Sequence, residues 1–241
     1  WMLAVVAYVV GAAVFLGLVG LGRYRMSKWL KRGRIVGDNR MTSLFYSSAR
    51  HINLRRPCRC VESRDITVPF TIGTFRPSVL IPSGYADNLS DTELRALFIH
   101  ELAHVKRLDS LVFSYVSVLR AVFFFNPLVW YAARQVSVLA ENACDDAVIE
   151  ADSNPLDYAE LLVRLARHLP EHALTTELAA GFILSKHSFL NRVKQILSDK
   201  KRIVTRLPKW AMAGCFASVF AILAVVIAVP AGEVRGADTA A

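Results

Sequence analysis

The most informative stretch of this chain reads His100-Glu101-Leu102-Ala103-His104, an H-E-x-x-H run. Residues at positions i and i+4 lie one above the other on one face of an α-helix. In a helix, the two imidazoles can therefore bind one metal ion, and Glu101 stands beside it to accept a proton from water. This arrangement suits metal-assisted hydrolysis of a peptide bond.

The sequence just before the run predicts the helix that the run requires. Ser90-Asp91-Thr92-Glu93 is an S-x-x-E capping box directly ahead of an apolar-periodic segment. Further upstream, the short β-type runs Val68–Ile72 and Ser78–Ile81 predict a small hairpin or a pair of strands. Their prolines indicate an edge position rather than a sheet centre. The predicted fold class is mainly α with a small β-hairpin or sheet.

A catalytic zinc site needs a third protein ligand in addition to two histidines. That ligand must be His, Glu, Asp or Cys on an element that folds back. Our choice is Glu141, because it lies in helical sequence and Asp145 follows it at i+4. Asp145 could then orient a ligand imidazole through its free N–H, and Asp109 is another candidate for this role. Spacing alone leaves open the alternative that Glu141 is a solvated helix residue.

Two apolar runs without charged residues, Trp1–Leu21 and Trp210–Pro230, occupy the two ends of a chain that is 54% hydrophobic. Each is long enough, at about 20 residues, to cross a bilayer as a helix. Basic clusters follow the first run and precede the second, so the positive-inside rule puts the region between them in the cytoplasm. We therefore predict a multi-pass protein of the cytoplasmic membrane whose peptidase domain faces the cytoplasm. Its predicted domains are a transmembrane helix at 1–22, a cytoplasmic metallopeptidase domain at 23–208, a transmembrane helix at 209–230 and a short extracytoplasmic tail at 231–241.

A third apolar run, near residues 110–133, is interrupted by Arg120 and by Asn126-Pro127. If it crossed the bilayer, Glu141 would lie on the other side from His100 and His104. A shared metal therefore predicts a buried or membrane-lying helix, a turn at Phe125–Pro127 and a second helix from Leu128. The alternative is a span in which Arg120 snorkels or pairs with another residue.

The net charge of +9 comes mainly from the two juxtamembrane clusters, which favour anionic lipid headgroups. No nucleic-acid-binding motif accompanies them, so no direct contact with nucleic acid is expected. The four cysteines are expected to be reduced and mostly structural, because the cytoplasm disfavours disulfides. Since the chain opens on Trp1 rather than methionine, we expect it to be a fragment.

Four motifs in order resemble the membrane metallopeptidase domain of bacterial β-lactam sensor-transducers of the BlaR/MecR type. They are Pro69-Phe70-Thr71 with Pro77–Pro82, the H-E-L-A-H-V-K-R-L-D run His100–Asp109, Phe125–Trp130 and Glu141–Asp145. The resemblance covers roughly Met2 to Pro230. It implies a gluzincin-like domain between transmembrane helices, with His100, His104 and Glu141 as Zn²⁺ ligands and Glu101 as catalytic base.

The resemblance also implies a role in signalling. Members respond to an outside signal, cut themselves in the loop before the last span (here about Gly181–Arg206) and promote loss of a transcriptional repressor. Expected partners are membrane lipids, a peptide substrate such as a winged-helix repressor, and a second copy of the chain. The β-lactam sensors carry a penicillin-binding domain after the last span, where this chain has Ala231–Ala241. Either the chain is truncated or this member lacks that sensor.

Two other functions fit the same residues. One is a membrane quality-control protease with many substrates. The other is a non-catalytic transducer in which zinc only holds helices together.

Overall fold

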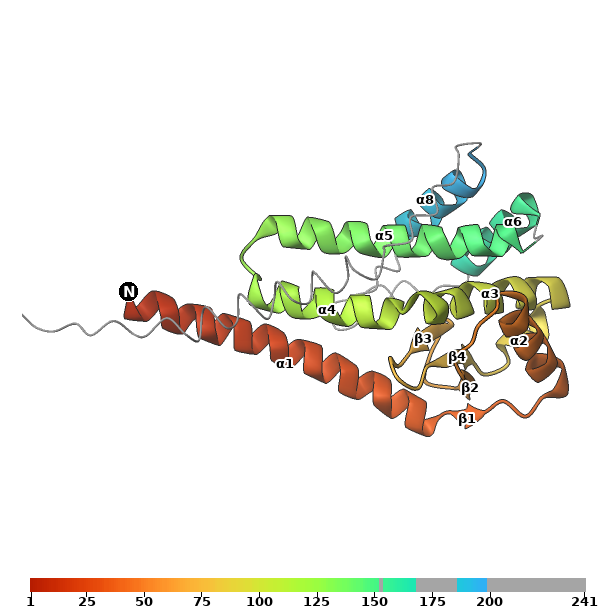
Figure 1. Cartoon of the computed structure of the whole chain (residues 1–241), viewed down its shortest axis with the longest axis horizontal. Coiled ribbons are helices and arrows are strands. Elements are labelled where there is room, and N and C mark those ends of the chain that lie inside the picture. Colours follow the sequence, from red (N-terminus) through yellow and green to blue (C-terminus); the bar gives the residue numbers. More distant parts are fainter. Residues whose placement is uncertain (152–153, 168–185, 199–241) are drawn as a thin grey trace, which may run out of the picture. The chain divides into compact units, whose positions relative to one another are not determined.

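A computed structural model describes residues 1–151, 154–167 and 186–198, with side chains of the last range from Leu190 (Figure 1). The helices are α1 (Met2–Arg32), α2 (Asn39–His51), α3 (Asp91–Arg107), α4 (Asp109–Val122), α5 (Pro127–Glu150), α6 (Pro155–Arg167) and α8 (Lys186–Ile196), with a 3₁₀ turn η1 (Tyr85–Asn88). The strands are β1 (Arg34–Ile35), β2 (Arg59–Ser63), β3 (Phe70–Ile72) and β4 (Ser78–Pro82). This confirms the predicted class, mainly α with a small sheet. The predicted second span and tail, 209–241, lie outside these ranges, as do residues 181–185 and 199–206 of the predicted loop.

The sheet has the strand order β1-β2-β4-β3. β3 and β4 pair antiparallel as the predicted hairpin, whereas β2 pairs with β4 in parallel and β1 closes the other side. β1 and β2 were not predicted. The predicted edge position is wrong for β4, which is central and buried along its whole length. Pro82 ends that strand and Pro77 precedes it, so neither proline interrupts the ladder.

Both faces of β4 are covered. On one face, Val79 and Ile81 join the main core with side chains of α2 and α3 such as Phe45 and Phe98. On the other face, Leu80 packs with Trp29 from the C-terminal end of α1. A strand that is buried on both faces reads as a continuous apolar run, which explains why Val79-Leu80-Ile81 has no polar alternation.

The helix α3 begins at the predicted capping box. Ser90 Oγ accepts a hydrogen bond from Glu93 N at 3.3 Å, and Glu93 Oε2 accepts one from Ser90 N at 2.8 Å. Leu94, Phe98, Ile99 and Leu102 have no exposed surface, so α3 is a central core helix. This packing fixes the orientation of the H-E-x-x-H face.

The third apolar run forms a helical hairpin, as predicted. α4 ends at Val122, a short turn follows, and α5 starts at Pro127 with Asn126 as its N-cap. α4 lies between α1 and α5 (Figure 1). The hairpin therefore returns the chain to α3, against which the second half of α5 packs.

Within the described ranges, α1 is the helix long and apolar enough to cross a membrane. Its most apolar 18-residue window has a mean hydropathy of 2.6, and none of that window is buried. Secretory signal sequences share this length and composition. Unlike them, α1 continues without a break into a basic segment that packs on the sheet.

Candidate metal centre

Two helices bring three metal-binding side chains to one point. Nε2 of His100 lies 3.4 Å from Glu141 Oε2, and Nε2 of His104 lies 3.5 Å from Glu141 Oε1. The ligand atoms of the three residues lie within 4.8 Å of one another. Both histidines are buried and Glu141 is partly buried. The predicted i, i+4 pair on α3 therefore faces the predicted carboxylate on α5.

Asp109 fixes the ring of His104. Its Oδ2 lies 2.8 Å from His104 Nδ1. The contact depends on Leu108, which joins α3 to α4 with φ of 65° and so turns the chain back on itself. Left-handed backbone costs a non-glycine residue about 1 kcal/mol. With Nδ1 occupied, only Nε2 of His104 is free to point toward Glu141.

Asp145 fixes the ring of His100 in the same way. Its Oδ1 lies 3.1 Å from His100 Nδ1. Asp145 follows Glu141 by one helical turn on α5. The Tyr158 hydroxyl, from α6, donates to Asp145 at 2.7 Å and also lies 3.1 Å from His100 Nδ1. Each imidazole thus has a carboxylate on the nitrogen that faces away from the third ligand.

A cation from α8 completes this network. Arg192 donates to Asp145 through Nε at 2.8 Å and Nη2 at 2.6 Å, and its Nη1 lies 3.1 Å from Glu141 Oε2. The side chain is buried, with 7% of the residue exposed. A planar guanidinium suits this bidentate contact, because its donors match the spacing of carboxylate oxygens.

The charge of Arg192 and the neighbouring histidines lower the pKa values of Glu141 and Asp145. Burial raises the pKa of Glu141, but the charge of Arg192 and the hydrogen bond from His100 outweigh it and give about 2. The same balance, with Arg192 as the main favourable partner, lowers the pKa of Asp145. Both carboxylates are therefore ionised at neutral pH. Burial and Arg192 lower the pKa of His100, yet the hydrogen bonds to Asp145 and Glu141 raise it to about 9 in the absence of metal.

Glu101 lies next to the two histidines on α3 but turns toward the sheet. The Thr71 hydroxyl, from β3, lies 2.9 Å from Glu101 Oε2 and 3.0 Å from the Glu101 carbonyl oxygen. Thr71 is buried and belongs to the edge strand beside α3. This contact ties the carboxylate of Glu101 to the strand that borders the site.

A second group with metal-binding atoms, His104, Asp109 and Cys144, lies behind the first. Burial raises the pKa of the Cys144 thiol well above its usual range, so the thiol stays protonated. Asp109 already accepts from Arg107 at 3.3 Å, besides its contact with His104. In this group, Asp109 orients His104.

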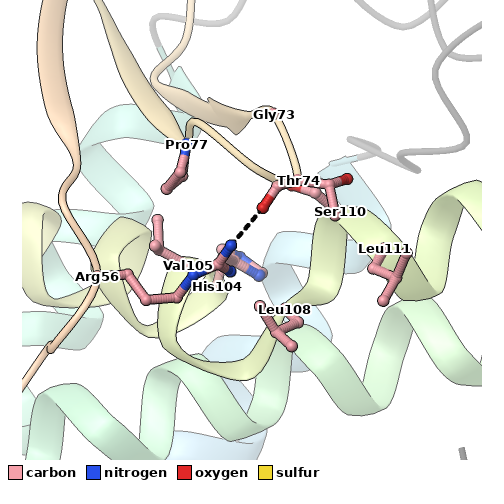
Figure 2. A pocket seen from close by; sticks show the side chains of 9 residues that line it. All are labelled: Arg56, Gly73, Thr74, Pro77, His104, Val105, Leu108, Ser110 and Leu111. Carbon is pink, nitrogen blue, oxygen red and sulfur yellow. Dashed lines mark hydrogen bonds between the residues drawn. The ribbon is translucent and has the colours of Figure 1, made fainter.

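A small recess lies beside His104, between the β3–β4 turn and the α3–α4 junction (Figure 2). It is too narrow to hold a water molecule. Arg56 donates to the Thr74 carbonyl at 2.6 Å across it. Gly73, with φ of 93°, tolerates no side chain, since a Cβ would lie 2.6 Å from the Arg76 carbonyl oxygen. Residues of the β3–β4 turn and Leu108 line this recess, so the turn and the α3–α4 junction pack closely here.

The sequence analysis named six side chains for this site, and all six lie in or around it. It missed two others. These are Tyr158 on α6 and Arg192 on α8. Neither has a local motif, because both reach the centre through tertiary packing. Of the other histidines, His51 is exposed on α2, and His168, His172 and the side chain of His187 lie outside the described residues.

The chain is similar to curated bacterial proteins. It is 28% identical over 200 residues to the regulatory protein BlaR1 of Bacillus licheniformis, an alignment that covers 82% of this chain and 31% of that protein. It is 25% identical over 137 residues to the methicillin resistance mecR1 protein of Staphylococcus aureus strain Mu50, covering 56% of this chain and 23% of that protein. The chain thus spans less than a third of the length of these relatives.

The family comparison covers all the elements described above. The model of the BlaR1 peptidase M56 family matches residues 1–196, from the start of α1 to the end of α8. This match includes every side chain of the candidate metal centre, and the chain belongs to the BlaR1 peptidase M56 family.

Proposed function

We propose that this chain is a zinc-dependent endopeptidase of the cytoplasmic membrane that acts in signal transduction. It would hydrolyse peptide bonds of itself or of a cytoplasmic transcriptional repressor. The convergence of His100, His104 and Glu141 beside Glu101 carries the proposal. Membership of a peptidase family supports the reaction class, and the regulatory and resistance roles in the relatives' names support the signalling role.

The donor set fits a catalytic zinc ion. Two imidazole nitrogens and one carboxylate are a ligand set of zinc hydrolases, which leaves the fourth position for water. The contacts of Asp109 and Asp145 with the Nδ1 atoms favour the Nε2 atoms as ligands of both His104 and His100. When bound there, zinc would lower the pKa of its water and polarise the scissile carbonyl.

Glu101 would act as the general base. It would take a proton from the attacking water and deliver it to the leaving amine. The hydrogen bond from Thr71 would hold its carboxylate in place during this transfer. The charge of Arg192 would keep Glu141 and Asp145 ionised, and so would keep the ligand set intact.

The edge strand β3 would bind the substrate. Its partner β4 lies on one side, and it ends the sheet order among the described strands. An extended peptide could add to the open side as a further strand, held by backbone hydrogen bonds. Since Thr71 contacts Glu101 from this strand, such a peptide would pass close to the proposed base.

We further propose that α1 anchors the chain in the membrane, with transmembrane helices at 1–22 and 209–230 and a peptidase domain at 23–208 in the cytoplasm. The hydropathy of α1 and its basic end support this orientation. Lipids, a winged-helix repressor and a second copy of the chain are proposed partners.

Self-cleavage is proposed for the segment 181–206. The described part of this segment, α8, reaches the site through Arg192, which lies 3.1 Å from Glu141. This proximity supports a substrate segment that is close to the centre in the same chain.

The decisive test is Glu101→Gln in the full chain, purified in lipid nanodiscs. We expect zinc content to stay at the wild-type level while hydrolysis of the chain and of added peptides, followed by mass spectrometry, is lost. Glu150→Gln, on an exposed position of α5, is the matched control. Unchanged hydrolysis in the zinc-loaded Glu101→Gln variant would overturn Glu101 as the base. Signalling that survives in this variant without hydrolysis would favour a non-catalytic transducer, and cleavage of many unrelated membrane proteins would favour quality control.

The ligand assignment has a separate test. Glu141→Ala should lower the zinc content measured by elemental analysis, as should His104→Ala, whereas the exposed His51→Ala should not. Full zinc occupancy in Glu141→Ala would mean that another residue is the third ligand.

A further inference from the structure

The turn of the α4–α5 hairpin packs against the middle of the apolar stretch of α1. Phe124 stacks on Tyr8 and on Phe15, with ring centroids 6.1 and 5.4 Å apart. Trp130, near the start of α5, meets the Phe15 ring edge-on. A Cβ on Gly11 would lie 2.5 Å from Phe124 Cζ, so the ring lies directly over that glycine.

These contacts fix how far along α1 the hairpin reaches. Gly11 precedes Arg23, the first charged residue of α1, by 12 residues. That separation is about 18 Å of helix, and the hydrocarbon core of a bilayer is about 30 Å thick. In a membrane spanned by α1, the turn would lie beyond the midplane. α5 then returns to Glu141, so the hairpin would enter and leave on the same side.

Three backbone polar groups at the turn have side-chain partners from α1 and from the start of α5. Tyr8 donates to the Val122 carbonyl at 3.1 Å, and Trp130 Nε1 donates to the Phe124 carbonyl at 2.9 Å. The Leu128 amide donates to the Asn126 side chain at 2.9 Å. In a loop exposed to water, water molecules could make these hydrogen bonds to the backbone. Hydrocarbon offers no such partner, and non-helical backbone at that depth must be satisfied internally.

The hydroxyl groups along the hairpin follow the same rule. Ser114, Ser117 and Ser137 each donate to the carbonyl four residues earlier in their own helix. This back-bonding removes the need for solvent.

Two arginines lie near the turn, and the Nε of one of them, Arg120, is buried without a hydrogen-bond partner among the described residues. The Arg120 guanidinium lies 4.2 Å from the centroid of the Trp130 ring, which offsets part of its desolvation. Arg134 is exposed and lies seven residues after Pro127, about 10 Å back toward the basic side of α1. From there its long side chain reaches the headgroup region.

The outer surface of the turn is apolar and uncovered by the described residues. Phe125 is 64% exposed, Leu128 72% and Tyr131 63%. This surface continues the exposed apolar surface of α1. We propose that α4–α5 is a re-entrant hairpin that inserts turn-first into the bilayer beside α1, and that lipid acyl chains cover these three side chains. The inference rests on the proposed anchoring by α1 and adds a second membrane-inserted element to it.

Site-specific photo-crosslinking in the full chain, expressed in bacterial membranes, tests this. The probe is p-benzoylphenylalanine in place of Phe125, Leu128 or Tyr131, with adducts identified by mass spectrometry. Position Val5, on the exposed face of α1, reports anchoring, and Tyr46, 53% exposed on α2, is the aqueous control. Zinc content equal to wild type verifies that each variant is folded.

We expect phospholipid adducts at Val5 and at two or more of the hairpin positions in similar yield, with none at Tyr46. Lipid adducts at Val5 alone would overturn the re-entrant hairpin and leave the anchoring intact. In that case, adducts of the hairpin positions with residues 203–230, or with a second copy of the chain, would identify the true cover. Absence of lipid adducts at Val5 as well would overturn the anchoring itself.

Discussion

The guanidinium of Arg192 is buried between the carboxylates of Asp145 and Glu141, so its removal would take away a counter-charge that both share. Breaking a buried ion pair by removing one partner costs about 3–5 kcal/mol. We predict that Arg192→Ala weakens zinc binding by about 10- to 100-fold, the usual cost of losing a group that orients the ligands. Arg192→Lys should recover part of this, because a lysine restores the charge but lacks the fork that holds Asp145.

Competition with a chromogenic chelator measures that affinity, and the visible spectrum of the cobalt-substituted protein reports the ligand geometry. The exposed Arg64→Ala serves as the control. A wild-type affinity and spectrum in Arg192→Ala would contradict a role of this residue in positioning the ligands.

The hydroxyl of Thr71 gives a second prediction at the residue scale. Thr71→Val keeps the shape of the side chain but removes its hydrogen bond to Glu101. A hydrogen bond to a charged group contributes about 1.5–3 kcal/mol, so kcat/KM for peptide hydrolysis should fall by about 10- to 100-fold. Zinc content should not change, and Thr71→Ser should restore most of the activity. A drop in zinc content would instead indicate that Thr71 supports the fold of the site.

The start of α3 determines how firmly the helix with both histidines is held. Ser90→Ala removes the cap and should destabilise the chain by about 1 kcal/mol. Burial raises the pKa of Glu93, but the hydrogen bonds with Ser90 and Arg164 hold it below its ordinary value of 4.5. A carboxyl group with a lowered folded-state pKa contributes stability that is fully present above its unfolded pKa and is lost as pH falls.

The midpoint of thermal unfolding should therefore fall below about pH 4.5, and more steeply in wild type than in Glu93→Gln. Scanning calorimetry at a series of pH values measures this difference. Parallel pH profiles for the two proteins would show that Glu93 does not contribute.

Contact between α1 and the hairpin can be tested with two glycines on the same helix. A side chain at Gly11 would collide with Phe124, whereas a Cβ at Gly17 would meet nothing within 4 Å. Overpacking costs about 1–3 kcal/mol, so Gly11→Val should lower the unfolding midpoint in nanodiscs while Gly17→Val should not. Equal midpoints for the two variants would contradict the packing of Phe124 over Gly11.

The elements differ in how far their sequence determines them. The α4–α5 hairpin and α3 could be predicted, because Asn126-Pro127 and the capping box are local. β1 has only two residues, Arg34 and Ile35, and β2 pairs in parallel with a strand from a separate part of the chain. Such pairing leaves no local pattern, which is why half of the sheet was missed.

The same distinction holds for the site in the whole molecule. His100, Glu101 and His104 follow from one spacing. The spacing of Glu141 to Asp145 indicated Glu141, with a solvated residue left open as the alternative, and the resemblance implied the same ligand. Tyr158 and Arg192 belong to α6 and α8, which follow α5 in the sequence and pack together beside the metal centre. Their contribution depends on the complete tertiary arrangement, so no single motif could predict it.

Removal of the metal should therefore affect many elements of the chain at once. The candidate ligands join α3 to α5, and the groups that orient them come from α4, α6 and α8. A ligand that binds only the folded state stabilises it by about 2.7 kcal/mol at 100 times its Kd. We predict that a chelator lowers the unfolding midpoint of wild type and of His51→Ala, but not of His104→Ala.

Hydrogen–deuterium exchange would show where this stability acts. After metal removal, exchange should rise in α3, the second half of α5 and α8, because these elements meet at the ligands. It should stay constant in β2 and in α1, whose contacts do not pass through the site. A uniform rise in exchange over the whole chain would contradict this pattern. It would mean that the metal stabilises the sheet and α1 as strongly as the helices that carry the site.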